Sequence, residues 1–242
     1  MRNEPLQNLM DQAPRGQPMD TEMLRDMGIS ERALSYLVSA AWLQRLGKGA
    51  YLLRGDHPTT EGVIAFLSRR IRGLHVGGKT ALDWQGVRHK VAFRPTVVLW
   101  GQDSYKFPDW VKDHLRYSYQ TTDLFEESLP YSEGLKPIPA GNPSVLVSVP
   151  ERAFLELVSD VGKGQTLEEV VNILATMRSI RAPVLHSFMA QCTRIKVLKL
   201  ARTLGEESGF AWGEDLQPHV DKRSRGKRWS NKMKDVRITL KP

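Results

Sequence analysis

The sequence contains a single cysteine, Cys192, among its 242 residues, so an intramolecular disulfide and a zinc site built on cysteines are both excluded. It also lacks any apolar run close to the roughly 18 residues that a membrane-spanning helix needs. Residues 1–20 are polar and contain proline, and they hold no apolar core of a secretory signal. We therefore expect a cytoplasmic protein with no membrane partner.

Patterns that would mark a catalytic or metal site are missing as well. The six histidines show no ligand spacing such as His-x-x-x-His. The glutamate pairs at 126–127, 168–169 and 206–207 are adjacent, and adjacent residues do not share a helix face, which makes them poor acid–base pairs. Cys192 is expected to be a buried, unreactive thiol. We expect no enzyme activity, no metal ion and no cofactor.

The positive charge of the chain is concentrated at its C-terminal end. The formal net charge is +8, and residues 218–242 hold nine basic and two acidic side chains, a net charge of +7 for that segment. Such a segment is typical of proteins that bind DNA or RNA. The alternatives are that it binds an acidic protein surface or that it only makes the chain end more soluble. The basic side chains proposed for this role are Lys222, Arg223, Arg225, Lys227 and Arg228.

The N-terminal quarter shows the order of elements found in a winged helix-turn-helix. A short helix is expected over 21–27, ending at Gly28, and Ser30 is a good N-cap for a second helix over 31–40. Two short apolar runs around Gly47-Lys48-Gly49 then predict a β-hairpin, the wing. The second helix has one apolar stripe, formed by Leu34, Leu37, Val38 and Ala41.

Burying that stripe turns the polar side chains of the second helix outward. Hydroxyls and flexible or aromatic side chains there can meet base edges and phosphates in the major groove. Ser30 lies at the helix N-terminus, where free N–H groups favour a phosphate, and the wing carries Arg45 and Lys48 near the adjacent DNA backbone or minor groove. The predicted DNA-binding residues are Ser30, Arg32, Ser35, Tyr36, Ser39, Arg45 and Lys48.

The charge of this module leaves a second interpretation open. Residues 20–54 hold five basic and four acidic side chains, and a net charge of +1 makes a weak electrostatic DNA binder. A winged helix that packs protein, as an interaction scaffold without DNA binding, fits the same sequence. If the module does bind DNA, the basic C-terminal segment is a source of the missing charge.

The rest of the chain mixes strands with a majority of helices. The breaker cluster Gly55-Asp56-His57-Pro58 places the domain boundary at residue 57. Helices are expected over 60–72, 80–85, 151–161, 167–177, 184–191 and 194–208, strands over 74–76, 87–93, 96–100, 145–149 and 236–240, and a loop region over 128–143. The fold class is α+β: a winged helix-turn-helix over 1–57, then a larger, helix-rich mixed α/β domain over 58–242 that ends in the basic segment 218–242.

Residues 73–80 match the formal pattern of a phosphate-binding loop, G-x-x-x-x-G-K-[ST]. That motif needs a strand before the first glycine and a helix after the last residue. Here residues 65–72 have a helical pattern, and residues 74–76 have a strand pattern where the flexible loop should be. We predict a structural turn. A nucleotide-dependent enzyme that uses Lys79 and Thr80 is the alternative.

Several segments, taken in order, resemble one known family. The run from Met23 to Tyr51, with Gly28-Ile29-Ser30 and Trp42-Leu43-Gln44-Arg45-Leu46-Gly47-Lys48-Gly49-Ala50-Tyr51, resembles the N-terminal domain of the AbiEi antitoxins. Three further segments are similar to elements of the same family: Gly77-Gly78-Lys79-Thr80-Ala81-Leu82, Val149-Pro150-Glu151-Arg152-Ala153-Phe154-Leu155-Glu156, and the end of the chain from Gly226 to Leu240. The resemblance covers most of the chain.

This resemblance implies a type IV toxin–antitoxin system. The antitoxin would repress its own operon by binding operator DNA through the winged helix. Its C-terminal domain would oppose a nucleotidyltransferase-like toxin without forming a stable complex with it. The family also implies an N-terminal unit that extends to about residue 92 rather than 57. The run from Lys222 to Arg228 departs from the family pattern, with more cations and fewer glycines.

The charge distribution generates a first prediction. Each phosphate contact contributes roughly 0.9 to the slope of log affinity against log salt. Replacing Lys222, Arg223, Arg225, Lys227 and Arg228 together with glutamine should flatten that slope by several units in operator-binding assays over a salt series. Discrimination between operator and random DNA should survive, because base reading stays on the helix over 31–40. An unchanged salt slope would remove this segment from the DNA-binding site.

Overall fold

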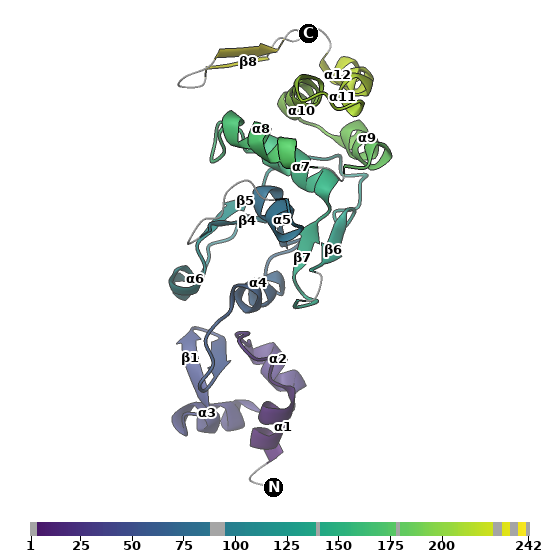
Figure 1. The fold of residues 1–242 in the computed structure, drawn as a ribbon. Helices are drawn as coiled ribbons and strands as arrows, with labels where there is room; N and C mark the ends of the chain where they lie inside the picture. The colour runs from purple at the N-terminus through teal and green to yellow at the C-terminus, as the bar shows by residue number, and fades with distance from the viewer. Residues whose placement is uncertain are drawn as a thin grey trace.

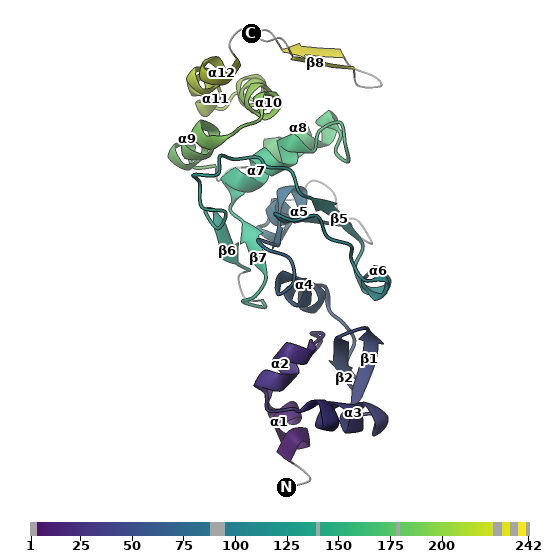
Figure 2. The ribbon, with the colours of Figure 1, turned by 180° about the vertical axis from the view of Figure 1, so that it is seen from behind.

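The chain is elongated, with the N-terminal module at one end, a five-stranded sheet in the middle and a group of helices beyond it (Figure 1). The structure is a computed structural model that describes residues 4–87, 95–138, 141–177, 180–224, 229–232 and 237–240. The view from behind again places the N-terminal helices and the last helices of the chain at opposite ends of the molecule (Figure 2). None of the described helices is long and apolar enough to cross a membrane.

The N-terminal module consists of three short helices and a hairpin. Helices α1 (Glu4–Gln12), α2 (Thr21–Asp26) and α3 (Glu31–Ser39) precede strands β1 (Leu43–Gly47) and β2 (Ala50–Leu53). Side chains cap the helix-turn-helix pair, because Asp20 accepts from the Met23 N–H at 2.7 Å and Ser30 from the Ala33 N–H at 3.2 Å. The core of this winged helix-turn-helix contains Leu9, Met19, Leu24, Met27, Ile29, Leu37, Leu43 and Leu53.

The prediction that Ala41 belongs to the apolar stripe of α3 is wrong. The helix ends at Ser39, and Ala41 is exposed with a φ of +58°, a left-handed conformation that is uncommon for any residue with a Cβ. This turn lets the Trp42 N–H donate to the Leu37 carbonyl at 2.8 Å, which closes the helix end. The stripe is therefore Leu34, Leu37 and Val38, and Ala41 belongs to the turn into the wing.

The central sheet joins segments that are far apart in the sequence. Its strand order is β5 (Tyr117–Gln120), β4 (Val97–Trp100), β3 (His75–Val76), β7 (Leu146–Ser148) and β6 (Leu135–Pro137). The pairs β4–β5 and β3–β7 are parallel, and the pairs β3–β4 and β6–β7 are antiparallel. Helix α4 (Thr60–Ser68) precedes the first strand of this sheet in the chain, α5 (Gly78–Trp84) lies between β3 and β4, and α6 (Asp109–His114) lies between β4 and β5.

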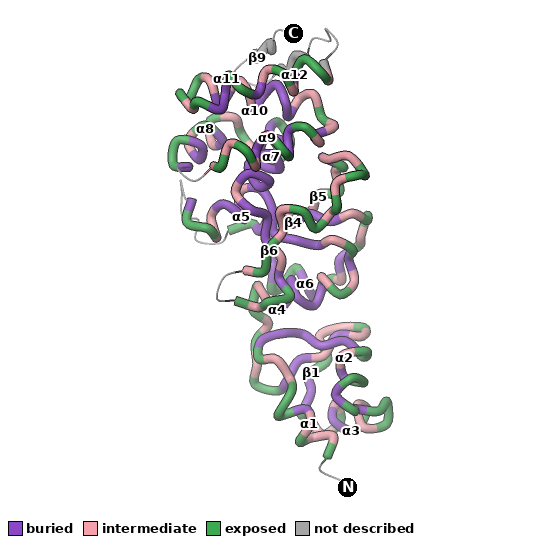
Figure 3. Tube along the Cα trace, turned by 90° about the vertical axis from the view of Figure 1, so that its right-hand side faces the viewer, coloured by how far each residue is buried: buried purple, intermediate pink, exposed green. Residues whose placement is uncertain are grey.

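Helix α7 (Pro150–Ser159) lies between the sheet and the remaining helices, and every residue from Glu151 to Ser159 is buried. The tube in Figure 3 shows this burial through the centre of the larger domain. Beyond α7 follow helices α8 (Leu167–Thr176), α9 (Ala182–Gln191), α10 (Ile195–Glu207), α11 (Trp212–Asp215) and α12 (Gln217–Ser224), and a hairpin of β8 (Trp229–Lys232) and β9 (Arg237–Leu240).

Several predicted elements differ from the structure. The stretch 128–143 is not a loop throughout, because it contains β6, whose Pro137 lies on the outermost strand, where a missing N–H is tolerated. Helix α4 ends at Ser68 instead of residue 72. Strand β5 and helices α6, α11 and α12 are elements that the sequence patterns did not indicate. Residues 88–94, which hold most of the strand expected over 87–93, lie outside the described residues.

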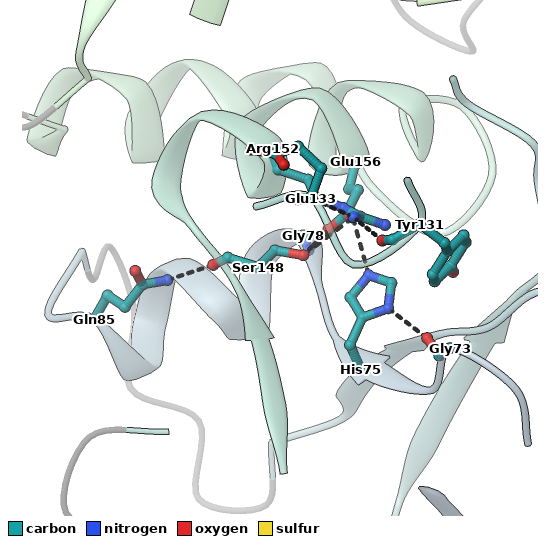
Figure 4. A network of polar contacts seen from close by, with 9 residues as sticks. All are labelled: Gly73, His75, Gly78, Gln85, Tyr131, Glu133, Ser148, Arg152 and Glu156. Carbon is teal, nitrogen blue, oxygen red and sulfur yellow. Dashed lines mark hydrogen bonds and ion pairs between the residues drawn. The ribbon is translucent and has the colours of Figure 1, made fainter. Parts of the chain in front are cut away.

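A buried network of charged groups connects the sheet to α5 and α7 (Figure 4). The Glu156 carboxylate accepts from His75 Nε2 at 3.0 Å, Arg152 Nε at 2.9 Å, the Ser148 hydroxyl at 2.8 Å and the Gly78 N–H at 3.0 Å. Arg152 Nη1 in turn donates to two loop carbonyls, those of Tyr131 and Glu133. The network thus pairs segments that lie up to 81 positions apart.

The environment of Glu156 decides its charge. Burial acts to raise its pKa, but the charges and hydrogen bonds of His75 and Arg152 outweigh burial and lower the pKa from 4.5 to about 2. The carboxylate of Glu156 lies so close to the backbone of residue 77 that this position requires a glycine. A Cβ on Gly77 would collide with Glu156 Oε2 and with the Trp100 ring. The Gly77-Gly78 pair and Glu156 are therefore parts of one structural unit.

Replacing Glu156 by glutamine should destabilise the protein by about 3–5 kcal/mol at pH 7, because it leaves buried positive charge without its partner. Urea unfolding would measure this, with exposed Glu168→Gln on α8 as the matched control. The folded pKa lies below the unfolded one, so the stabilisation is complete above about pH 5 and is lost as pH falls toward 2. The gap between wild type and variant should shrink over that range. Equal stabilities at pH 7 would refute this role.

Candidate DNA-binding face and the contacts that hold it

Helix α3 presents the predicted side chains on one exposed face. Arg32, Ser35, Tyr36 and Ser39 are all exposed, while Leu37 is buried on the opposite side. Tyr36 has 61% of its surface exposed, the most of the exposed large hydrophobic residues among the described ones. An exposed tyrosine beside an arginine offers an aromatic face, a hydroxyl and a guanidinium, groups that can contact bases and phosphates.

The serines of this helix have local partners. The Ser35 hydroxyl donates to the Glu31 carbonyl at 3.0 Å, and the Ser39 hydroxyl donates to the Tyr36 carbonyl at 2.9 Å. Each hydroxyl oxygen keeps its acceptor capacity. Ser30 Oγ already caps the helix by accepting from Ala33, so an anion at this helix end would meet the remaining free N–H groups.

The tip of the wing contacts the larger domain. Gly47 lies against the Trp110 ring of α6, where an added Cβ would be 2.6 Å from Trp110 Cδ1, and the Gly49 carbonyl accepts from Arg70 Nη2 at 3.1 Å. The backbone of the Gly-Lys-Gly tip is thus used for packing. The side chains of Arg45 and Lys48 remain exposed. Helix α3, the wing and α6 lie along the same side of the molecule, on the left in Figure 1 and on the right in Figure 2.

A second contact, here called the clasp, joins Asp20 to Arg69 and Arg70. The Asp20 side chain, only 8% exposed, accepts from Arg69 Nε and Arg70 Nη1, both at 3.1 Å, while it also caps α2. Burial acts to raise the pKa of Asp20, but the hydrogen bonds from Met23 and Arg69 and the charges of both arginines lower it. One carboxylate therefore starts the helix-turn-helix and fastens it to the end of α4.

The segment before α2 strengthens the same interface. The Thr59 N–H donates to the Gly16 carbonyl at 2.9 Å, and the Asn142 side chain donates to Gln17 Oε1 at 2.6 Å. Asp56 accepts from the Gly16 N–H at 2.9 Å. Together with the clasp, these contacts fix the direction of the wing relative to the sheet.

The basic C-terminal segment is only partly described. Lys222 and Arg223 lie in the last turn of α12, and Arg223 forms an ion pair with Glu126. Arg225, Lys227 and Arg228 lie outside the described residues.

The phosphate-loop pattern does not have the structure of such a loop. Helix α4 lies before Gly73, strand β3 lies between the glycines, and the Lys79 ammonium forms an ion pair with Glu169 on α8. Cys192 is buried, and burial raises its pKa to about 11, which agrees with an unreactive thiol. In the described ranges no three His, Cys, Asp or Glu side chains come together as a metal site would require.

Neither the clasp nor the exposed Trp42 was found from the sequence. Asp20 precedes the helix expected over 21–27, the Arg69-Arg70 pair falls inside the helix expected over 60–72, and neither pattern indicates a contact between them. Trp42, 38% exposed beside the end of α3, also joins the exposed surface of the module. The only available signal was a pair of adjacent arginines, which is common on protein surfaces.

The fold and this face define a class: a winged helix-turn-helix module joined to a larger α+β domain, the architecture of a transcriptional regulator. The model of the N-terminal domain of AbiEi antitoxin transcriptional regulators matches residues 2–93, and the model of AbiEi antitoxin transcriptional regulators of type IV toxin–antitoxin systems matches residues 94–241. The chain belongs to this family of antitoxins and transcriptional regulators, which are not enzymes.

The structural comparison agrees with this architecture. The crystal structure of the RV2827C protein from Mycobacterium tuberculosis is similar with a TM-score of 0.57 and 15% identity, over 90% of this chain and 80% of that chain. At this identity the likeness concerns the fold alone. No curated protein matches the chain.

The boundary between the two family models lies between residues 93 and 94. The hydrophobic core of the N-terminal module, in contrast, ends at Leu53. Helices α4 and α5, which the N-terminal family model includes, pack in the core of the larger domain.

Replacing Asp20 tests the clasp. Asp20→Asn keeps an N-cap acceptor but removes the charge that pairs with Arg69 and Arg70, and we expect a loss of about 1 kcal/mol in unfolding free energy. Asp20→Ala removes the cap as well and should cost about 1 kcal/mol more. Chemical denaturation would measure both. Glu22→Gln, which removes the exposed partner of Arg69, is the control and should stay within about 0.5 kcal/mol of wild type. A change in Asp20→Asn no larger than in the control would contradict the clasp.

Proposed function

We propose that this protein represses its own operon by binding operator DNA with the exposed face of α3. The observation that carries the proposal is the row of exposed side chains Arg32, Ser35, Tyr36 and Ser39 on the second helix of a winged helix-turn-helix. A recognition helix in this architecture lies in the major groove, and its outward side chains contact base edges. Ser30 at the helix start, with Arg45 and Lys48 on the wing, would contact the flanking phosphates.

The antitoxin activity is assigned to the larger domain, which we place from about residue 58 onward. Its proposed target is a nucleotidyltransferase-like toxin, opposed without a stable complex, as the family implies. A protein that binds operator DNA would act in the cytoplasm. The basic segment 218–242 would add the long-range attraction to DNA, or to RNA, that the nearly neutral module lacks.

The alternative is an interaction scaffold whose winged helix contacts only protein. Two observations favour it: the module has a net charge of only +1, and its wing tip is already packed on Arg70 and Trp110. Gel shifts with the DNA upstream of the gene separate the two functions. Specific retardation supports the repressor, and no binding at low salt supports the scaffold. Growth rescue on co-expression with the neighbouring toxin gene tests the antitoxin separately.

Truncating the recognition face should weaken operator binding without unfolding the protein. Arg32→Ala should cost about 1–3 kcal/mol of operator affinity, measured by fluorescence anisotropy, while the melting temperature stays nearly unchanged because Arg32 is exposed. The control is Lys136→Ala, which removes an exposed positive charge from β6 in the larger domain. Full operator binding by the Arg32→Ala, Tyr36→Ala double variant would exclude α3 as the reading helix.

A further inference from the structure

Two side chains of the larger domain hold the tip of the wing. The Gly49 carbonyl accepts a hydrogen bond from Arg70 Nη2 at 3.1 Å, and Gly47 lies against the buried ring of Trp110 on α6. Both side chains also contact Phe66 on α4. The Arg70 guanidinium lies 3.9 Å from the centre of the Phe66 ring, and the Trp110 ring meets Phe66 edge-on, with centroids 5.3 Å apart. Phe66, Arg70 and Trp110 are here called the wing socket.

Arg70 holds two parts of the winged helix-turn-helix at once. Its Nη1 donates to Asp20, which starts α2, and its Nη2 donates to Gly49 at the tip of the wing, both at 3.1 Å. A planar guanidinium can donate in two directions while its face packs on an aromatic ring, and the ammonium of a lysine cannot reproduce that arrangement. The adjacent Arg69 also pairs with Asp20, but its second partner among the described residues is Glu22 on α2 instead of the wing.

The wing depends on such contacts for its order. It is a two-stranded hairpin, and a hairpin of this kind is only marginally stable without further packing. On the side away from β1, Tyr51 pairs with Met19 through backbone hydrogen bonds of 2.7 and 2.9 Å, and the tip rests on the wing socket. A wing that is ordered before binding loses less conformational freedom when its exposed side chains, Arg45 and Lys48, meet a ligand.

We propose that Arg70 is a positioning residue for operator binding: it keeps the wing tip in place, so that the side chains of the wing and of α3 meet the DNA in a fixed arrangement. This inference rests on the proposed repressor function. Arg70 itself does not touch the DNA, because its guanidinium already contacts a carboxylate, a carbonyl and an aromatic ring. The packing of the wing tip, which by itself fits a protein-binding scaffold, thus also fits a DNA-binding module whose wing is ordered in advance.

Operator binding by the full-length Arg70→Lys variant tests the proposal. Fluorescence anisotropy is measured at a temperature at which circular dichroism shows that the variant is folded. We expect an operator affinity about tenfold lower than that of wild type, because the wing must then be ordered on binding. The slope of log affinity against log salt should not change, since no phosphate contact is lost. Arg69→Lys is the matched control: it disturbs the same contact with Asp20 but not the wing, and should bind within about twofold of wild type.

The order of the wing tip can be measured without DNA. Heteronuclear ¹⁵N Overhauser effects of the Lys48 and Gly49 amides report motion of the tip in the full-length protein. We expect lower values in Arg70→Lys than in wild type, and wild-type values in Arg69→Lys.

A substitution on the wing disturbs the same contact from the other side. In Gly47→Ala the new Cβ would lie 2.6 Å from Trp110 Cδ1, so the tip has to move away from the wing socket. This variant should lose operator affinity as Arg70→Lys does. Gly164→Ala is its control, because an added Cβ there meets nothing within 4 Å, and it should bind as wild type does.

The remaining outcomes each decide against the proposal. Wild-type operator affinity in Arg70→Lys, or a wing tip as ordered as in wild type, would overturn the positioning role. A salt slope lower by roughly 0.9 would make Arg70 a phosphate contact instead. An equal loss of affinity in Arg69→Lys would assign the effect to the pairing of Asp20 and not to the wing. If the wild-type protein does not bind operator DNA, the proposed function fails and this inference fails with it, so the wild-type titration tells the two failures apart.

Discussion

The ionised carboxylate of Glu156 accepts hydrogen bonds from β3, α5, β7 and its own helix α7, and these four elements form the centre of the larger domain. Once the carboxylate is buried, each donor becomes necessary, because an unpaired charge in that position would cost several kcal/mol. The neighbouring Glu151 works in the same way toward the outer helices, since its carboxylate holds Arg181 at the start of α9 by bidentate contacts of 2.8 and 2.9 Å. The segment from Pro150 to Glu156 therefore connects the sheet on one side to the helices on the other.

A carboxylate that pairs with arginines, here less deeply buried, also connects the two domains. The winged helix has a small core, and modules of this size are only marginally stable by themselves. The clasp of Asp20, Arg69 and Arg70 and the packing of Gly47 on Trp110 attach it to the larger domain. Residues 69–73 run directly from this clasp to the buried network of Glu156, because the Gly73 carbonyl oxygen lies 2.8 Å from His75 Nδ1. One short segment of chain thus connects the clasp to the buried network of Glu156.

The charges relevant to nucleic acid are distributed unequally. The module that contains the proposed recognition helix has a net charge close to zero, while the excess of positive charge lies at the opposite end of the sequence. Under the proposed function, base reading and general attraction to phosphate would therefore lie on separate segments, and substitutions in one need not impair the other.

Local patterns in the sequence were sufficient for the winged helix-turn-helix, the outward face of α3 and most helices of the larger domain, because caps, turns and apolar periodicity act over a few residues. They failed where the apolar signal was short, as in β6 and α12, and at Ala41, where a turn replaced the expected helical position. Only the tertiary structure brought Asp20 to Arg69 and Arg70, 49 and 50 positions away, and His75 to Glu156, 81 positions away. Each of these side chains, taken alone, fits an ordinary surface residue. Their roles depend on a low-dielectric interior that exists only after the chain has folded, and no local pattern encodes which distant charges will be buried together.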